Sequence, residues 1–194
     1  GPLPAGPVRL VEAMGDFDGD GVGGDRFLLY PGSAGTWVAR MELTYGYSSA
    51  VDYPSHAVTA EARAVDLGGT AQLAIVVSVG ESGNPYVDFF AWRRSGLHTC
   101  ELVRAEDPAA VGGFRGFPLV DAEREKVGIT CQDAGIKLTL ATSTDGITWR
   151  ATSRVLYWDT LAETFYSDPG VGFVLTLHSP EDDALIQSYA DFDC

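Results

Sequence analysis

Carboxylates at alternate positions stand near the N-terminus of the chain, in a segment that is also rich in glycine. The oxygen donors of this segment are Asp16, Asp18, Asp20, the carbonyl of Val22 and Asp25. Gly19 and Gly21 permit the positive φ angles that a tightly curled loop needs. When the loop curls, these donors converge on one cation. Ca²⁺ takes about six to eight hard oxygen ligands in flexible geometry, so the spacing predicts a Ca²⁺ site.

The residues that follow this loop distinguish between the known kinds of Ca²⁺ loop. No helix is expected after Asp25 and no Glu stands at the twelfth loop position, which excludes an EF-hand. Residues 27–30 instead read as a strand, which indicates a loop–strand site. The alternative is an acidic hairpin tip that binds no metal.

Residues 16–25 resemble the FG-GAP/VCBS repeat, the Ca²⁺-binding Asp-x-Asp-Gly-Asp-Gly-x-x-Asp loop of integrin-α-like propellers and many secreted bacterial proteins. Three Asp side chains and one backbone carbonyl match the family's positions, namely Asp16, Asp18, Asp20 and Val22. The family's last Asp falls at the ninth position, where this sequence has Gly24, and Asp25 comes one place later. The resemblance implies a Ca²⁺ cofactor, a β-propeller and an extracytoplasmic location.

Strand signals dominate the rest of the chain, and no window shows helical periodicity over three turns. Short runs rich in Val, Ile, Thr and aromatic residues are separated by Gly, Pro, Asp or Ser. The predicted strands are 27–30, 37–43, 58–65, 73–79, 86–92, 99–103, 127–131, 136–141, 148–158, 171–177 and 184–189. Strands of this length and spacing indicate an all-β sandwich, barrel or propeller.

Two series of similar segments recur at a period of roughly 50 residues, which is in the range of propeller blades. Tetrads that begin with Trp start at Trp37, Trp92 and Trp149, and turns that lead into apolar strands start near 16, 66, 121 and 168. We therefore predict a β-propeller-like domain over 8–194, with about four small antiparallel sheets. Residues 8–13 would supply the missing strand of the fourth sheet. A β-sandwich with duplicated hairpins is the alternative.

A second local motif supports the propeller prediction. The segment Ser143-Thr144-Asp145-Gly146-Ile147-Thr148-Trp149 is similar to the Asp-box of sialidase-like propellers. In that hairpin Ser and Asp bond their own backbone while Trp packs inside, and Asp-Gly suits a tight turn. The resemblance implies a structural role and no sialidase activity.

The three cysteines are Cys100, Cys131 and Cys194, and none of them has the Cys-x-x-Cys spacing of a zinc site. Cys100 and Cys131 both fall in strand-like runs, so a disulfide between them is predicted, with Cys194 as the odd thiol. Two alternatives are that Cys194 pairs with one of the others, and that all three are buried thiols. A disulfide favours an oxidising compartment.

The balance of charge limits the classes of partner. The formal net charge is −14, with 13 basic and 27 acidic residues. Such a surface repels phosphate backbones and anionic membranes, so no nucleic acid and no direct membrane insertion are expected. No run approaches the about 18 apolar residues of a membrane span. Residues 1–7 read as a protease-cleavage scar, Gly1-Pro2, and a Pro/Gly linker.

No catalytic constellation is predicted. His56, His98 and His178 are scattered without zinc-ligand spacing, and there is no Gly-x-Ser-x-Gly elbow. Glu181 belongs to an acidic cluster that is typical of a solvated loop.

Tyrosines in a polar segment are the candidate ligand surface. They are Tyr45, Tyr47 and Tyr53, and rings in such a setting are common at protein and sugar recognition sites. The alternative is ordinary packing with the hydroxyl at the rim. We therefore expect an extracytoplasmic, Ca²⁺-stabilised module that binds a protein or glycan, such as the outer domain of an anchored receptor, and not an enzyme. The rival hypotheses are a secreted polysaccharide hydrolase or lyase and a structural cell-surface spacer.

Overall fold

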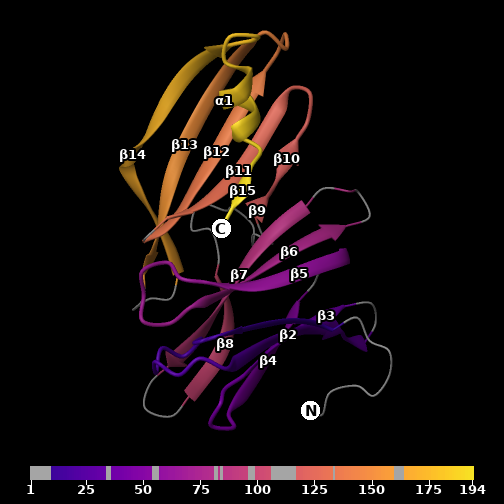
Figure 1. The fold of residues 1–194 in the computed structure, drawn as a ribbon, viewed down its shortest axis with the longest axis vertical. Helices are drawn as coiled ribbons and strands as arrows, with labels where there is room; N and C mark the ends of the chain where they lie inside the picture. The colour runs from indigo at the N-terminus through magenta and orange to yellow at the C-terminus, as the bar shows by residue number, and fades with distance from the viewer. Residues whose placement is uncertain are drawn as a thin grey trace. The chain divides into compact units, whose positions relative to one another are not determined.

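The computed structural model describes residues 10–33, 36–53, 57–80, 83, 85–95, 99–105, 117–132, 134–159 and 164–194. Within these residues the chain forms three open β-sheets and one short helix, which confirms the all-β prediction (Figure 1). Three sheets are described rather than the four predicted, and they are consistent with a sandwich or a propeller-like arrangement. The chain divides into two compact units, one within 1–83 and 88–104 and the other within 84–87 and 105–194.

The first sheet of the first unit is an antiparallel meander in the order β1-β2-β3-β4. Its strands are β1 (Val11–Gly15), β2 (Asp25–Pro31), β3 (Trp37–Glu42) and β4 (Ser48–Tyr53). Buried and half-buried residues alternate strictly along β3, as expected for a strand with one face in a core.

The second sheet follows the same up-and-down plan in the order β5-β6-β7-β8. Its strands are β5 (Ala57–Val65), β6 (Leu73–Gly80), β7 (Pro85–Ser95) and β8 (Thr99–Ala105). The two-residue strand β9 (Phe117–Pro118) pairs with the first residues of β7.

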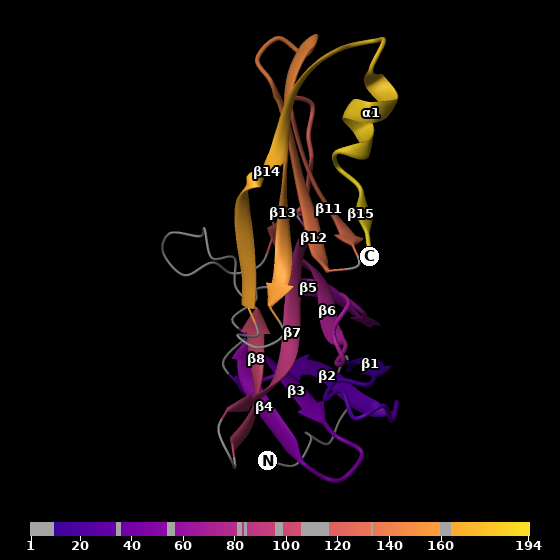
Figure 2. The same cartoon turned by 90° about the vertical axis from the view of Figure 1, so that its left-hand side faces the viewer.

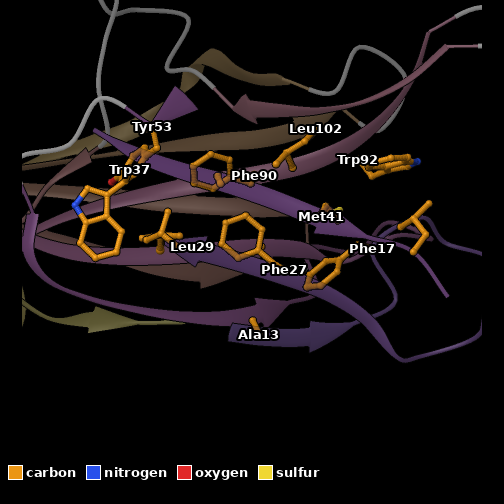
Figure 3. Packing of buried hydrophobic residues seen from close by; sticks show 14 residues of the cluster. Ala13, Phe17, Phe27, Leu29, Trp37, Met41, Tyr53, Phe90, Trp92 and Leu102 are labelled. Atoms are coloured by element: carbon orange, nitrogen blue, oxygen red, sulfur yellow. The ribbon is translucent and has the colours of Figure 1, made fainter. Parts of the chain in front are cut away.

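The core of the first unit is formed by side chains from both of its sheets (Figure 3). Phe27 of β2 contributes one ring and Phe90 of β7 another, with 5.1 Å between the ring centroids. The Tyr53 ring meets Phe90 edge-on at 5.7 Å. All three residues are at most 2% exposed. Burial of large apolar side chains of this kind stabilises a fold by about 1.5 to 3 kcal/mol each, so this layer holds the two sheets together.

The second unit is built on a sheet in the order β10-β11-β12-β13-β14, with β15 parallel to β11. Its elements are β10 (Val120–Asp121), β11 (Glu125–Gln132), β12 (Gly135–Ser143), β13 (Thr148–Asp159), β14 (Thr164–His178), α1 (Asp183–Ser188) and β15 (Phe192–Asp193). Helix α1 packs Ile186 against Trp149 and Leu177 on one face of this sheet (Figure 2). Over the described residues, no helix has the length and apolar character needed to cross a membrane.

The predicted strand at 184–189 is wrong, because these residues form most of helix α1. Two details of the predicted repeats also differ from the structure. Asp168, the predicted start of the fourth repeat, lies inside β14, because the β13–β14 hairpin continues past it and absorbs extra residues at an irregularity between Arg154 and Leu156. The segment expected to complete a fourth sheet instead forms β1 and pairs with β2, where Val11 lies opposite Leu29. Residues 8 and 9 lie outside the described residues.

The predicted Cys100–Cys131 disulfide is wrong. Cys131 is bonded to Cys194 across 63 positions, with 4.7 Å between the Cα atoms. The pairing of β11 with β15 explains this choice, since Thr130 lies opposite Asp193 and the following residues are therefore neighbours. Cys100 lies in β8 of the first unit.

Candidate metal site

Three carboxylates converge in the loop between β1 and β2. Asp16, Asp18 and Asp25 each offer one oxygen, and these three oxygens lie within 4.8 Å of one another. The antiparallel pairing of Gly15 with Asp25 produces this convergence, because it places the two ends of the loop side by side. The extra residue before Asp25 therefore does not remove this carboxylate from the group.

Asp16 holds the curl of the loop through backbone amides. Its Oδ1 accepts the N–H groups of Gly19 at 2.9 Å and Asp20 at 3.1 Å, and its Oδ2 accepts that of Gly21 at 2.9 Å. Gly19 and Gly21 have φ angles of 72° and 82°, so the predicted glycine conformations are present. Oδ1 accepts two amides, whereas Oδ2 accepts one and keeps a second lone pair with which it can contact a cation.

Asp25 is the most deeply buried of the three acids, with 1% of its surface exposed. Its Oδ2 accepts the Phe17 N–H at 3.0 Å and its Oδ1 accepts the Thr44 N–H at 2.9 Å. A buried carboxylate is costly unless charge-assisted hydrogen bonds compensate it, and these two amides do so. Asp25 thereby joins the acidic loop to the turn between β3 and β4.

The loop is also attached to the second sheet of the first unit. The Asp16 N–H donates to Gln72 Oε1 at 2.9 Å, and the Gln72 N–H donates to the Asp16 carbonyl at 2.8 Å. A Cβ atom on Gly19 would lie 3.0 Å from the backbone nitrogen of Ala71, so the two loops are in close backbone contact. Nothing in the sequence near the acidic loop points to Gln72, which is why sequence reasoning missed it.

Of the predicted side-chain ligands, Asp20 is not a member of this three-carboxylate group. Asp20 is exposed and its Oδ1 accepts the Val22 N–H at 2.7 Å. The Val22 side chain is 55% exposed, and the role of its carbonyl stays a prediction. The observed group is therefore Asp16, Asp18 and Asp25.

The electrostatics of the group favour a cation. Two unit negative charges about 4 Å apart repel by about 1 kcal/mol in water and by about 4 kcal/mol near a protein surface. A cation between them removes this repulsion. The donors are all hard carboxylate oxygens, which suit Ca²⁺ or Mg²⁺ better than soft metals that prefer Cys or His.

The predicted tyrosine surface divides into an exposed pair and a buried residue. Tyr45 is 50% exposed and Tyr47 is 65% exposed, with 5.4 Å between their ring centroids. They flank Gly46, which has a φ of 94°, in the turn that joins β3 to β4. Tyr53 is 2% exposed and is not part of this surface, because its ring belongs to the core and its hydroxyl to a buried polar cluster.

That buried polar cluster contains Tyr53, Ser78, Asp88 and Arg104. The Arg104 Nε–H donates to Asp88 Oδ1 at 2.7 Å, the Tyr53 hydroxyl donates to Asp88 Oδ2, and Ser78 Oγ lies 3.1 Å from that hydroxyl. Burial raises the pKa of Asp88, while the charge of Arg104 and the two hydrogen bonds oppose the rise. Tyr53 comes from β4 and the other three from β6, β7 and β8, so the cluster connects the two sheets of the first unit.

The residues of the Asp-box-like segment form the hydrogen bonds expected of that hairpin. Asp145 Oδ1 accepts the N–H groups of Thr148 at 2.7 Å and Ile147 at 2.9 Å. The Ser143 hydroxyl donates to the Thr148 carbonyl at 2.7 Å, and Trp149 is 4% exposed in the core beneath α1. The segment is therefore a structural hairpin of the second unit.

The Asp145 hairpin predicts a pH-dependent contribution to stability. The amides of Thr148 and Ile147 lower the pKa of Asp145 in the folded chain. A lowered folded pKa gives stability that is present above the unfolded pKa of about 3.9 and is lost as pH falls through the folded value. We expect Asp145→Ala to lower the Tm at pH 7, with a difference from the unmodified chain that shrinks below about pH 4. Glu181→Ala is the control, and a difference that stays constant to pH 2 would contradict the prediction.

Among the described residues, the remaining polar candidates are not members of the three-carboxylate group. His178 is exposed at the end of β14, and its backbone N–H donates to Asp182 Oδ2 at 2.7 Å. Glu181 is exposed in the turn before α1. His56 and His98 lie outside the described residues.

Comparison with protein-family models, with curated proteins and with solved structures finds no match.

Proposed function

We propose that the chain is an extracytoplasmic recognition module whose first unit is stabilised by Ca²⁺. The observation that carries the proposal is the convergence of Asp16, Asp18 and Asp25, with one oxygen from each within 4.8 Å of the others. The similarity of the loop to the FG-GAP/VCBS repeat supports the choice of Ca²⁺. Carboxylates and carbonyls are also the donors that Ca²⁺ prefers.

In this proposal Asp16, Asp18 and Asp25 hold the metal, and a bound Ca²⁺ supplies the positive charge that offsets their repulsion. Asp16 keeps the loop curled through its bonds to Gly19 and Gly21. Because the closed loop belongs to the folded state alone, binding free energy adds to folding stability.

The same loop positions the proposed ligand surface, which is the exposed pair Tyr45 and Tyr47. Asp25 Oδ1 accepts the Thr44 N–H directly before this pair, and the Leu43 N–H donates to the Tyr47 carbonyl at 2.8 Å. Exposed tyrosines give a large contact area with little loss of side-chain entropy on binding. The proposed role of the pair is recognition of a protein or a glycan.

The disulfide supports an extracytoplasmic location. Cys131 and Cys194 are bonded, and disulfides form and persist mainly in oxidising compartments. The secreted and cell-surface proteins that carry similar loops agree with this placement.

We expect Ca²⁺ to raise the Tm of the chelator-treated protein by roughly 5 to 10 °C when its concentration is about 100 times the Kd. Asp18→Asn removes one charge from the group and should abolish most of this rise. Asp52→Asn is the matched control, because Asp52 is an exposed acid of the same sheet that lies in β4, outside the loop. An unchanged Tm on adding Ca²⁺, or an equal rise in Asp18→Asn, would contradict the metal proposal.

A further inference from the structure

A hollow of about 500 Å³ lies on the sheet of the second unit. It is lined by Gln132, Ala134, Gly135, Val155 and Tyr157. The strand register explains why these residues meet. Gln132 at the end of β11 lies opposite Gly135 at the start of β12, and Gly135 lies opposite Tyr157 of β13.

Gly135, which lines the hollow, lies in close backbone contact with β13. A Cβ atom at this position would lie 2.0 Å from the carbonyl oxygen of Leu156, so no other residue fits without moving the backbone. The neighbouring backbone is fixed as well, since the Trp158 N–H donates to the Ala134 carbonyl at 2.8 Å. The backbone at this edge of the hollow is therefore held in place.

An aromatic surface borders the hollow. Tyr157 lies directly across from Tyr166 of β14, and their rings stack with 5.6 Å between centroids and 29° between planes. Tyr166 is 49% exposed. A cross-strand pair of this kind contributes about 0.2 to 1 kcal/mol to a sheet. The exposed part of the Tyr166 ring is not needed for packing within the sheet. It can therefore serve as a binding surface next to the hollow.

The chemistry of the lining points to a neutral sugar. The rings of Tyr157 and Tyr166 present an apolar aromatic surface on which the C–H face of a sugar ring can pack. The exposed amide of Gln132 can both donate to and accept from sugar hydroxyls. None of the described residues that line the hollow is charged, and the net charge of −14 disfavours anionic glycans.

We propose that this hollow, with the Tyr157–Tyr166 pair as its aromatic wall, is a binding site for neutral carbohydrate. The proposal deepens the recognition function proposed above and uses none of the metal-site residues. The two can therefore fail separately.

The test is calorimetric titration of the whole chain with three neutral oligosaccharides, cellohexaose, maltohexaose and mannohexaose, and with polygalacturonate as an anionic comparison. We expect at least one neutral sugar to bind with a Kd between about 10 μM and about 1 mM. Tyr166→Ala and Gln132→Ala should each weaken that binding about tenfold or more. Tyr166→Phe, which keeps the ring, should retain most of it and shows that loss in Tyr166→Ala is not caused by misfolding.

Tyr47→Ala distinguishes this site from the exposed tyrosine pair of the β3–β4 turn, which belongs to the other unit. Sugar binding that survives Tyr166→Ala but is lost in Tyr47→Ala would overturn this inference and place the glycan site at the β3–β4 turn. Absence of binding to all three neutral sugars would also overturn it. In either case the Ca²⁺-dependent rise in Tm would be unaffected.

Discussion

Replacing Arg104 with leucine is expected to lower the free energy of unfolding by about 3 to 5 kcal/mol, the largest effect of any single substitution considered for this chain. The reason is that Asp88 is only 2% exposed and Arg104 is its positively charged partner. Leucine keeps much of the volume of the arginine stem but leaves the carboxylate buried without a compensating charge. Urea unfolding of the two chains at pH 8 measures the difference.

Three comparisons test this explanation. The double variant Arg104→Leu/Asp88→Leu should recover a large part of the loss, because it removes the uncompensated charge together with its partner. Tyr53→Phe removes only one hydroxyl from the cluster and should cost about 1 to 3 kcal/mol. Since burial raises the pKa of Asp88, protonation relieves the penalty in Arg104→Leu, and the loss should be smaller near pH 4 than at pH 8. A pH-independent loss that the double variant does not recover would contradict this explanation.

The second large effect is expected from the disulfide. Replacing Cys131 and Cys194 together with serine should lower the free energy of unfolding by about 4 kcal/mol, because the bond closes a loop that spans 63 positions in the unfolded chain. The loop contains β12, β13, β14 and α1, so the loss should fall on the second unit. Thermal unfolding with and without a reductant measures it.

Cys100→Ser is the control for this prediction, because it leaves the Cys131–Cys194 bond in place. The control variant should lose stability on reduction as the unmodified chain does, whereas the double serine variant should be insensitive to the reductant. A reductant-sensitive double variant, or peptide mapping that joins Cys100 to Cys131, would contradict the observed pairing.

The features that sequence reasoning predicted correctly are local ones. The strand predicted at 37–43 is β3 (Trp37–Glu42), and the curl around Asp16 depends on contacts no more than five positions apart. The hairpin held by Asp145 likewise depends on neighbours within three positions. For such motifs, glycines and short polar side chains at fixed spacing determine the geometry, so the sequence carries the necessary information.

The features that sequence reasoning missed depend on contacts between residues that are distant in the chain. Tyr53 and Asp88 are 35 positions apart and meet only because two sheets pack face to face. Cys194 reaches Cys131 through the parallel pairing of β15, which is a two-residue strand with no sequence signal of its own. Asp168 stands in an Asp-Pro-Gly segment that is typical of a turn, yet β14 runs through it, because pairing with β13 stops at Ser167 and resumes at Gly172.

The proposal that Asp16, Asp18 and Asp25 form a Ca²⁺ site is tested most directly by calorimetric titration of Ca²⁺ into the chelator-treated protein. We expect one saturable site per chain that binds Mg²⁺ more weakly, that is lost in Asp18→Asn and that is retained in Asp52→Asn. Absence of saturable Ca²⁺ binding in the unmodified chain, or binding that is undiminished in Asp18→Asn, would contradict it.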